Sequence, residues 1–314
     1  MGYVLVLNIC VLTDALNAAA ITGAALALVL RPHWRGALLA GLLLAVSEGC
    51  REATIYLAFA FLPLALLARP RWLCAGLVLS PVWAVAAAQV AWNVSRGAGP
   101  VLTTSKQLVM VMALLPLFKQ HLPVYDGDPV FAAAAQGTID GGQFSGIDAF
   151  TARLYAHGET PVQIAAEAGR DYAYSWRRFP LPMLKMTLQN FRYDDLYMPC
   201  EPQKAMAMLY LYAHGARPDF DRLSVQWRAF RHGDMAAGGV FFASWGLGLL
   251  GMAISLAGLV APWRRQAAWR ERALWCIPVA LGLMYMPVHL EPRYLVPGVP
   301  LICILAAAGL RRNV

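Results

Sequence analysis

Long apolar runs that end at polar turns recur along this chain, and they constrain its fold more than any other feature. The run from Trp72 to Asn93 contains no charged residue, and neither does the run from Val240 to Ala261. A helix of about 20 such residues crosses the hydrocarbon core of a bilayer, because each residue adds about 1.5 Å. Backbone groups in hydrocarbon must satisfy their own hydrogen bonds, which a helix does. The chain is therefore predicted to be a helical membrane protein.

The composition also indicates that water is not the main solvent around this chain. Of the 314 residues, 59% are hydrophobic and 14% are charged, with a mean hydropathy of +0.51. A soluble domain carries about 25% charged residues. The net charge of +8 comes mostly from cations in short loops between apolar runs, so we interpret it as a signal of membrane topology and expect no nucleic-acid partner.

The predicted fold class is all-α, a polytopic transmembrane bundle of about seven spans with a helical segment on its outer face. The spans are expected near residues 14–30, 36–47, 53–68, 72–93, 240–261, 273–288 and 294–310. The second and third are short, and the polar turn 47–52 between them is expected at the tip of a hairpin in or near the membrane face.

Basic residues in the short loops set the predicted orientation, because cytoplasmic loops accumulate Lys and Arg. One topology places all of the short basic loops on the same side, those with Arg31 and Arg35, Arg69 and Arg71, residues 264–272, and residues 311–312. The C-terminus is then cytoplasmic in a multi-pass protein of a bacterial inner membrane. Asp14, the turn 48–52, the long polar segment and residues 289–293 face the outer side.

Three regions follow from this topology: transmembrane helices in 1–94, an outer-face (periplasmic) helical segment in 95–236, and transmembrane helices in 237–314. Residues 181–191 and 219–231 mix apolar and basic side chains, a pattern typical of membrane-surface helices. Packing of these helices against the outer ends of the spans is the alternative. The apolar stretch 108–117 is too short for a secure span and is expected to be re-entrant or interfacial.

A helix start is predicted inside the outer segment. Thr160, Pro161 and Gln163 have the pattern of an N-cap, a proline at the first helical position and a reciprocal glutamine. The helix that follows is expected to run to about Arg178.

The first residues allow two interpretations. Residues 1–12 are apolar but too short to span alone, and the first clear span begins at Asp14, so the chain reads as beginning partway through a larger protein. The alternative is a single long helix from Tyr3 to Leu30.

Charged residues at membrane depth are rare unless they are paired or functional. Asp14 begins a predicted span, where it either caps the helix or takes part in chemistry. Arg51 lies among the carboxylates of residues 48–52, where it either closes the hairpin through an ion pair or offers its guanidinium to a lipid-linked phosphate. Asn93 lies at the end of the fourth predicted span. It is either one of the polar residues that a loop leaving the membrane requires, or it faces a substrate.

The turn before the last span is the most informative polar stretch. It holds His289, Glu291, Arg293 and Tyr294 between two apolar runs, and its prolines prevent a simple continuous helix. The turn is either a polar interfacial turn anchored by Tyr294 or a rigid charged turn that contacts an anionic headgroup. No CxxC motif and no His/Cys cluster indicates a metal site.

The last of these motifs carries a resemblance. Residues 289–310 (HLEPRYLVPGVPLICILAAAGL) resemble the final outer loop and last helix of polyprenyl-phosphate-sugar-dependent membrane glycosyltransferases, the type C fold that includes protein mannosyltransferases and aminoarabinose transferases. Four other stretches are similar to that family in the same order, residues 13–16, 41–51, 92–93 with the Thr-rich loop after them, and 174–180. Most of the chain is covered by these loose motifs.

The resemblance implies sugar transfer from a polyprenyl-phosphate donor to a glycan, lipid or protein acceptor on the outer face. In that family the catalytic acid pair lies in a loop after the first transmembrane helix, and this chain has no such loop upstream of Asp14, so it looks like a family member without the N-terminal part. Some members use a divalent metal, for which no ligands are identified here.

Residue roles follow from the same resemblance. Asp14 and Glu291 are expected in acidic catalytic roles, and Arg51 and Arg293 at the donor phosphate. Tyr294, His289 and Asn93 are expected to orient the substrates. No cofactor is identified.

Two other classes of function compete. A non-catalytic membrane scaffold or partner subunit explains the missing front end without truncation. A secondary transporter is less favoured, because the sequence has no internal repeat and no paired broken helices.

Overall fold

The computed structural model is all-helical over the residues that it describes. These are residues 2–51, 54–96, 100–102, 105–125, 127–140, 147–190, 206–207, 210–211, 214, 220, 222–263, 267–286 and 296–311. No β-strand occurs in this part of the chain, so the predicted all-α class is confirmed there.

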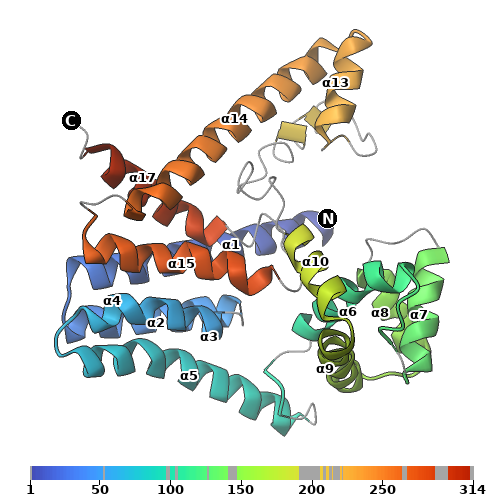
Figure 1. Cartoon of the computed structure of the whole chain (residues 1–314), viewed down its shortest axis with the longest axis horizontal. Coiled ribbons are helices and arrows are strands. Elements are labelled where there is room, and N and C mark those ends of the chain that lie inside the picture. The colour runs from blue at the N-terminus through green and yellow to red at the C-terminus, as the bar shows by residue number, and fades with distance from the viewer. Residues whose placement is uncertain are drawn as a thin grey trace. The chain divides into compact units, whose positions relative to one another are not determined.

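The chain forms two compact units, shown by residue number in Figure 1. Unit 1 comprises Met1–Ser80, Arg192–Gly282 and Glu291–Val314, and unit 2 comprises Pro81–Phe191 and Leu283–Leu290. The boundary between the units falls inside helix α5 (Arg71–Ser95).

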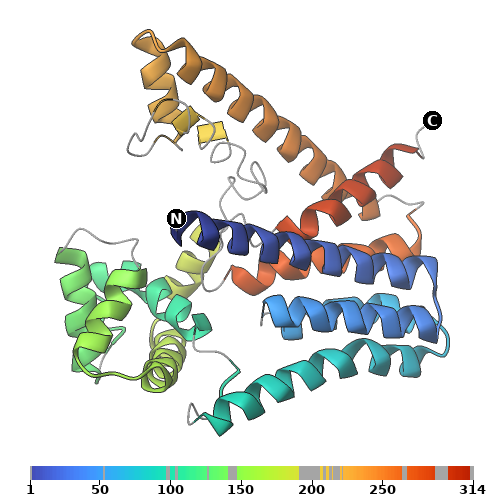
Figure 2. The same ribbon diagram turned by 180° about the vertical axis from the view of Figure 1, so that it is seen from behind.

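The first half of unit 1 is a bundle of antiparallel apolar helices. Helix α1 (Gly2–Leu30) packs along α2 (Trp34–Cys50), and the chain returns through α3 (Thr54–Leu57), the 3₁₀ turn η1 (Ala58–Phe61) and α4 (Leu62–Leu66). Figures 1 and 2 both show α1 and α2 side by side. Alanines line much of their contact, since Ala24, Ala25, Ala37 and Ala40 are each 0% exposed. Small residues let helices approach closely without a large apolar core.

Helix α1 shows how the backbone runs through the first residues. Helix α1 is continuous from Gly2 to Leu30, as the single-helix alternative predicted. The helix therefore begins before Asp14, because the apolar residues on both sides of Asp14 continue one helical pattern. A membrane span near residues 14–30 stays a prediction.

The second half of unit 1 is built on α14 (Met235–Val260). The short helix α13 (Leu223–Arg231) packs against it, and α14 ends in the 3₁₀ turn η2 (Ala261–Trp263). Helix α15 (Trp269–Tyr285), the turn η3 (Val296–Gly298) and α17 (Val299–Arg311) follow, and α17 also packs on α14. A Cβ on Gly258 of α14 would lie 2.5 Å from the Ile302 carbonyl oxygen of α17, so this contact requires a glycine.

Two of the described helices are long and apolar enough to cross a membrane, α5 and the helix made of α14 and η2. Exposed tryptophans lie near both ends of α5, Trp72 (74% exposed) and Trp92 (60% exposed). They are 20 residues apart in the sequence, about 30 Å along a helix, which matches the hydrocarbon thickness between two interfacial aromatic belts. The stretches Ala15–Leu30, Thr54–Leu66 and Val299–Gly309 are shorter apolar helices.

Unit 2 continues from α5 into five helices with a core of their own. These are α6 (Ser105–Lys119), α7 (Pro129–Asp140), α8 (Ile147–Ala156), α9 (Pro161–Arg178) and α10 (Pro180–Asn190). The core contains Leu114, Phe131, Phe150 and Ile164, each at most 1% exposed. Leu114, Leu115 and Leu117 belong to this core, so the second half of residues 108–117 packs within unit 2. Its position relative to a membrane stays a prediction.

The predicted start of α9 is confirmed. The Thr160 hydroxyl accepts a hydrogen bond from the Gln163 backbone N–H at 3.3 Å, and Gln163 Oε1 accepts from the Thr160 backbone N–H at 3.0 Å. The helix ends at Arg178 as expected. The predicted helices at 181–191 and 219–231 are found as α10 and α13.

Candidate functional site

Unit 1 has a basic end, where two loops meet. The Arg69 backbone N–H donates to the Pro32 carbonyl at 3.2 Å, and His33 pairs with Arg69 in an isolated bridge. The loops that carry Arg31, Arg35, Arg69 and Arg71 therefore lie together, which agrees with their predicted placement on one side.

A buried polar cluster lies toward the opposite end of the same helices. Asn17 of α1, Ser47 of α2 and Thr54 of α3 are each at most 3% exposed. Ser47 lies 13 residues into α2, about 20 Å from the basic end at 1.5 Å per residue. The cluster is therefore deep inside apolar helices, where polar side chains are uncommon.

The hydrogen bonds of this cluster run in one direction. The Ser47 hydroxyl donates to Asn17 Oδ1 at 2.5 Å, and Ser47 Oγ lies 2.8 Å from Thr54 Oγ1. A hydroxyl has one proton, and that of Ser47 is committed to Asn17. Thr54 is therefore the donor to Ser47, and the three side chains tie α1, α2 and α3 together.

Glu48 is a carboxylate next to this cluster, and it is 1% exposed. Its Oε2 accepts a hydrogen bond from the Ile55 backbone N–H at 2.6 Å. This hydrogen bond joins the last turn of α2 to the start of α3. From the sequence, Glu48 was expected only to neighbour Arg51.

Arg51 lies just after α2 and is half-buried. Its backbone N–H donates to the Ser47 carbonyl at 2.8 Å, and its carbonyl accepts from the Thr54 N–H at 3.0 Å. These bonds make the turn, so they place the start of the Arg51 side chain beside Ser47 and Glu48. Arg51 is about 25 Å from the basic end along α2.

Asp14 does not cap a helix, because α1 continues through it. It lies three residues before Asn17 on α1, and residues three apart in a helix share a face. The structure therefore brings the backbone of Asp14 to the region of the polar cluster.

Asn93 binds the loop that follows α5. Its side-chain nitrogen donates to the Val101 carbonyl at 2.7 Å and to the Leu102 carbonyl at 3.2 Å. Both amide hydrogens are thereby engaged, and the start of α6 is held close to the end of α5. This structural role was one of the two expected from the sequence.

The remaining predicted site residues, His289, Glu291, Arg293 and Tyr294, lie outside the described residues. Of the seven, Asp14 and Arg51 lie on the elements that form the polar end of the first bundle, and Asn93 lies in unit 2.

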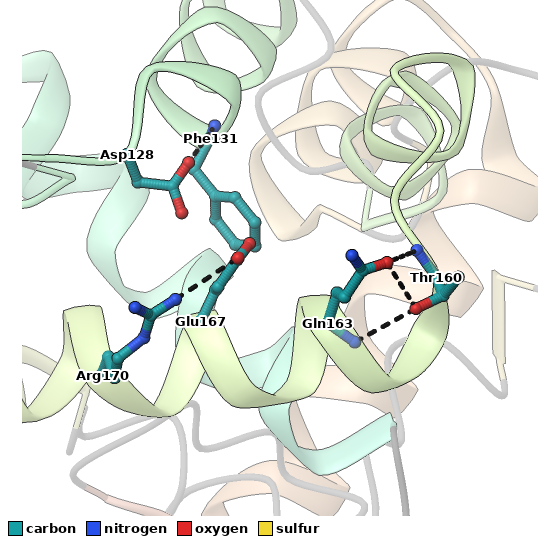
Figure 3. Close-up of polar contacts among 6 residues, drawn as sticks. All are labelled: Asp128, Phe131, Thr160, Gln163, Glu167 and Arg170. Atoms are coloured by element: carbon teal, nitrogen blue, oxygen red, sulfur yellow. Dashed lines mark hydrogen bonds and ion pairs between the residues drawn. The ribbon is translucent and has the colours of Figure 1, made fainter. Parts of the chain in front are cut away.

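Sequence reasoning missed a second polar group, an acidic cluster in unit 2. Asp128 caps α7, where its Oδ1 accepts from the Phe131 N–H at 3.1 Å, and Glu167 rises toward it from α9 (Figure 3). Glu167 also pairs with Arg170 at 3.3 Å. Asp171 and Glu159 complete the cluster. The sequence pattern of α9 could have revealed Asp171, because this aspartate lies on the face of the helix that Ile164 and Ala168 bury in the core.

The carboxyl groups of this cluster shift each other's titration. Burial raises the pKa of Asp171, the charge of Asp128 raises it further, Arg170 lowers it and Glu167 raises it, to a final value of about 7. Burial also raises the pKa of Glu167, as do the charges of Asp128 and Glu159 and a side-chain hydrogen bond with Asp128. A hydrogen bond between two carboxyls requires that one of them is protonated.

Neither cluster has the geometry of a metal centre. Within the described part of the chain, no group of three or more His, Cys, Asp or Glu residues could hold a metal ion. The chemistry that the two clusters offer comes from carboxyl, guanidinium, hydroxyl and amide groups. In comparisons with family models, curated proteins and solved structures, nothing matches this chain.

Proposed function

We propose that this protein is a multi-pass membrane glycosyltransferase that moves a sugar from a polyprenyl-phosphate donor to an acceptor on the outer face of a bacterial inner membrane. The observation that carries the proposal is the polar end of the first bundle. There a carboxylate that is 1% exposed and the half-buried Arg51 lie beside three hydrogen-bonded polar side chains, among helices that are otherwise apolar.

The depth of Arg51 fits a lipid-linked phosphate. Such a phosphate lies at the boundary between headgroups and hydrocarbon, and Arg51 is about 25 Å from the basic end of a layer about 30 Å thick. Its guanidinium offers paired N–H donors to phosphate oxygens. As the sugar leaves, negative charge develops on the donor phosphate, and a fixed cation stabilises that charge.

The other residues take the roles that the resemblance gives them. Asp14 and Glu291 supply carboxylates, one of which deprotonates the acceptor hydroxyl, and Arg293 is a second cation for the phosphate. His289, Tyr294 and Asn93 orient the substrates. Glu48 is a positioning residue, since its carboxylate binds the backbone of α3 and so fixes the turn that carries Arg51.

The proposal includes a path of the chain through the membrane. With the basic end cytoplasmic, α1, α2, the α3–α4 segment, α5, α14, α15 and α17 make about seven crossings and leave the C-terminus in the cytoplasm. Helices shorter than about 20 residues cross by lying against longer neighbours or within a thinned bilayer.

A second candidate is a non-catalytic scaffold. It is favoured by the polar cluster itself, because the chain of hydrogen bonds from Thr54 through Ser47 to Asn17 ends within the protein and ties three helices. The two candidates differ in what Arg51 must do, since a scaffold does not require its charge at a substrate.

The test is transfer of labelled sugar from a panel of polyprenyl-phosphate sugars by the purified chain in lipid nanodiscs. Arg51→Ala is expected to lower the rate by about 100-fold or more, as removal of one transition-state donor does, and Arg51→Lys to restore part of it. Arg35→Ala changes an exposed arginine at the basic end and serves as the matched control.

Loss of transfer in Arg51→Ala with an unchanged Arg35→Ala variant supports the enzyme. Full activity in Arg51→Ala removes the proposed phosphate contact. No transfer from any donor, by this chain or by a version extended to an upstream start, favours the scaffold.

A further inference from the structure

Two stretches at the basic end of unit 1 repeat one sequence pattern. Residues 31–34 read RPHW, and residues 69–72 read RPRW. The Arg69 backbone N–H donates to the Pro32 carbonyl at 3.2 Å, and Arg69 pairs with His33 in a parallel bridge. The two copies of the pattern therefore lie directly beside each other, joined by their backbones.

The turn between α1 and α2 is held by short contacts. The Arg31 backbone N–H donates to the Ala27 carbonyl at 3.0 Å, and the His33 N–H donates to the Arg31 carbonyl at 2.7 Å. His33 then caps α2, because its Nδ1 accepts a hydrogen bond from the Arg35 backbone N–H at 3.2 Å. A Cβ on Gly36 would lie 2.0 Å from the Arg31 carbonyl oxygen, so the close approach of α2 to the end of α1 requires a glycine. Contacts from both helices thus position the backbone of Arg31.

No carboxylate in the described part of the first bundle lies near these cations. Arg31, Arg69 and Arg71 are exposed, and none of them forms an ion pair within the described part of the chain. Between residues 15 and 80, the acidic residues are Glu48 and Glu52. Glu48 lies about 20 Å from the basic end along α2, and Glu52 follows it in the sequence. The three guanidiniums are therefore available to an anion from outside the chain.

Large apolar side chains are exposed directly beside these guanidiniums. Leu30 (74% exposed) precedes Arg31, and Trp72 (74% exposed) and Leu73 (51% exposed) follow Arg71. A soluble anion needs only the cations, whereas exposed leucine and tryptophan side chains are unfavourable in water. Tryptophan is also typical of the boundary between headgroups and hydrocarbon, where lipid phosphates lie. An amphiphile with an anionic headgroup and apolar chains fits both kinds of side chain.

We propose that Arg31, Arg69 and Arg71 form a binding site for the phosphate of an anionic phospholipid. Their guanidiniums donate paired N–H bonds to the phosphate oxygens, while the acyl chains lie along the exposed leucine and tryptophan side chains. Arg35 is not part of the site, because its guanidinium lies over the Trp34 ring, 5.2 Å from the centroid.

The lipid site rests on the membrane placement in the proposed function, but not on sugar transfer. It lies about 25 Å from Arg51 along α2. Because the bound lipid takes cations from both stretches of the repeated pattern, it stabilises their contact. Lipid binding and sugar transfer can therefore fail independently of each other.

The experiment is native mass spectrometry of the full chain in detergent, with an equimolar mixture of phosphatidylglycerol and phosphatidylcholine that have the same acyl chains. The two lipids differ in net charge, so a preference between them measures the contribution of the headgroup. We expect at least about a tenfold preference for phosphatidylglycerol, since each arginine adds to the attraction of an anionic lipid. Glycerol 3-phosphate is the soluble probe, and an excess of it should not displace the lipid.

A double variant and a matched control locate the site. Arg31→Gln with Arg69→Gln is expected to lower the preference about tenfold, because one guanidinium is lost from each stretch. Arg270→Gln with Arg272→Gln removes the same charge from another basic loop, where Arg272 also lies over an exposed tryptophan, 5.1 Å from the Trp269 centroid. The preference of this control should match that of the wild type. Sugar transfer by the same preparations is measured separately.

Equal retention of the two lipids by the wild-type chain overturns the proposal and leaves the arginines as a signal of topology alone. An unchanged preference in the Arg31→Gln, Arg69→Gln variant does the same, as does an equal loss in the control variant, which would show attraction to net charge without a site. Displacement by glycerol 3-phosphate would identify a site for soluble anions instead. The single variant Arg71→Gln should also lower the preference, and it keeps the test decisive if the double variant does not fold.

Discussion

The two polar clusters of this protein differ in how their buried polar groups are hydrogen-bonded. In unit 1, Asn17, Ser47 and Thr54 are almost fully buried and form a directed series of hydrogen bonds. In unit 2, Asp171 is buried to a similar degree, but its Oδ2 has no partner in the described part of the chain and its neighbours are other carboxyls.

The difference follows from the surroundings of each cluster. Apolar side chains supply no hydrogen bonds, so polar groups buried between apolar helices must pair within the protein. The acidic cluster lies in a unit with charged residues on its exposed faces, where protons and solutes from water can reach its partly exposed members. Stability should therefore be insensitive to pH in the first cluster and sensitive to pH in the second.

The largest expected effect is that of Asp171→Asn at alkaline pH. The folded state keeps the Asp171 proton up to about pH 7, whereas the unfolded chain loses it near the ordinary pKa of 3.8. The folded state binds more protons in this window, so the free energy of unfolding of unit 2 falls as the pH rises from about 4 to 7. Removal of the charge should raise stability above pH 7 by roughly 2–4 kcal/mol and leave it unchanged near pH 4.

Hydrogen exchange of the α9 amides, corrected for the intrinsic dependence on pH, measures this effect within unit 2. Asp171→Asn should give more protection than wild type at pH 8 and similar protection at pH 4.5, while Asp140→Asn, which changes an exposed carboxylate at the end of α7, matches wild type at both. If Asp171→Asn and wild type are equally protected at pH 8, the burial of a charged carboxylate has been compensated by another group.

For the first cluster we predict a loss of stability that does not depend on pH. Ser47→Ala removes the donor to Asn17 and the acceptor for Thr54, so two buried polar groups lose a partner. We expect a loss of about 1–3 kcal/mol in stability, equal at pH 5.5 and pH 8 because no group of this hydrogen-bond series titrates there.

Thermal unfolding in detergent at both pH values measures it, with Ser80→Ala as control, since Ser80 is exposed on α5. A Ser80→Ala variant should stay within about 0.5 kcal/mol of wild type. A destabilisation of Ser47→Ala that changes between pH 5.5 and pH 8 would contradict the proposed contrast between the clusters.

The same contrast explains which features could be predicted from the sequence. Helices α5 and α14 were predictable because an unbroken apolar run of span length has few other structures, and α9 because Thr160 and Gln163 form a local capping motif. Asp14 was misread because an aspartate before an apolar run is typical of an N-cap, and only the continuous helix around it excludes that role.

Both clusters depend on contacts between residues far apart in the chain. Asn17 and Ser47 are 30 residues apart, and Asp128 meets Glu167 only after three helices have packed. No local pattern encodes such pairs, so the sequence predicted Arg51 as a candidate but not the hydrogen bonds behind it. The packing of Leu114, Leu115 and Leu117 in the core of unit 2 could not be predicted for the related reason that an apolar stretch looks alike whether it enters a bilayer or the core of a small helical unit.

The smallest expected effect tests a polar contact that water can replace. Thr160 and Gln163 are exposed and exchange hydrogen bonds at the start of α9, so Thr160→Ala should lower the stability of unit 2 by about 1 kcal/mol, within the usual range for an N-cap. Thr160→Ser keeps the cap and should stay close to wild type. Because the two side chains act as a pair, the double variant Thr160→Ala with Gln163→Ala should lose less than the sum of the single losses, as measured by hydrogen exchange of α9. If the stability losses of the two single variants add up in the double variant, the two side chains do not act as a pair. If Thr160→Ala loses as much stability as Ser47→Ala, the distinction between contacts that water can replace and contacts that it cannot is wrong.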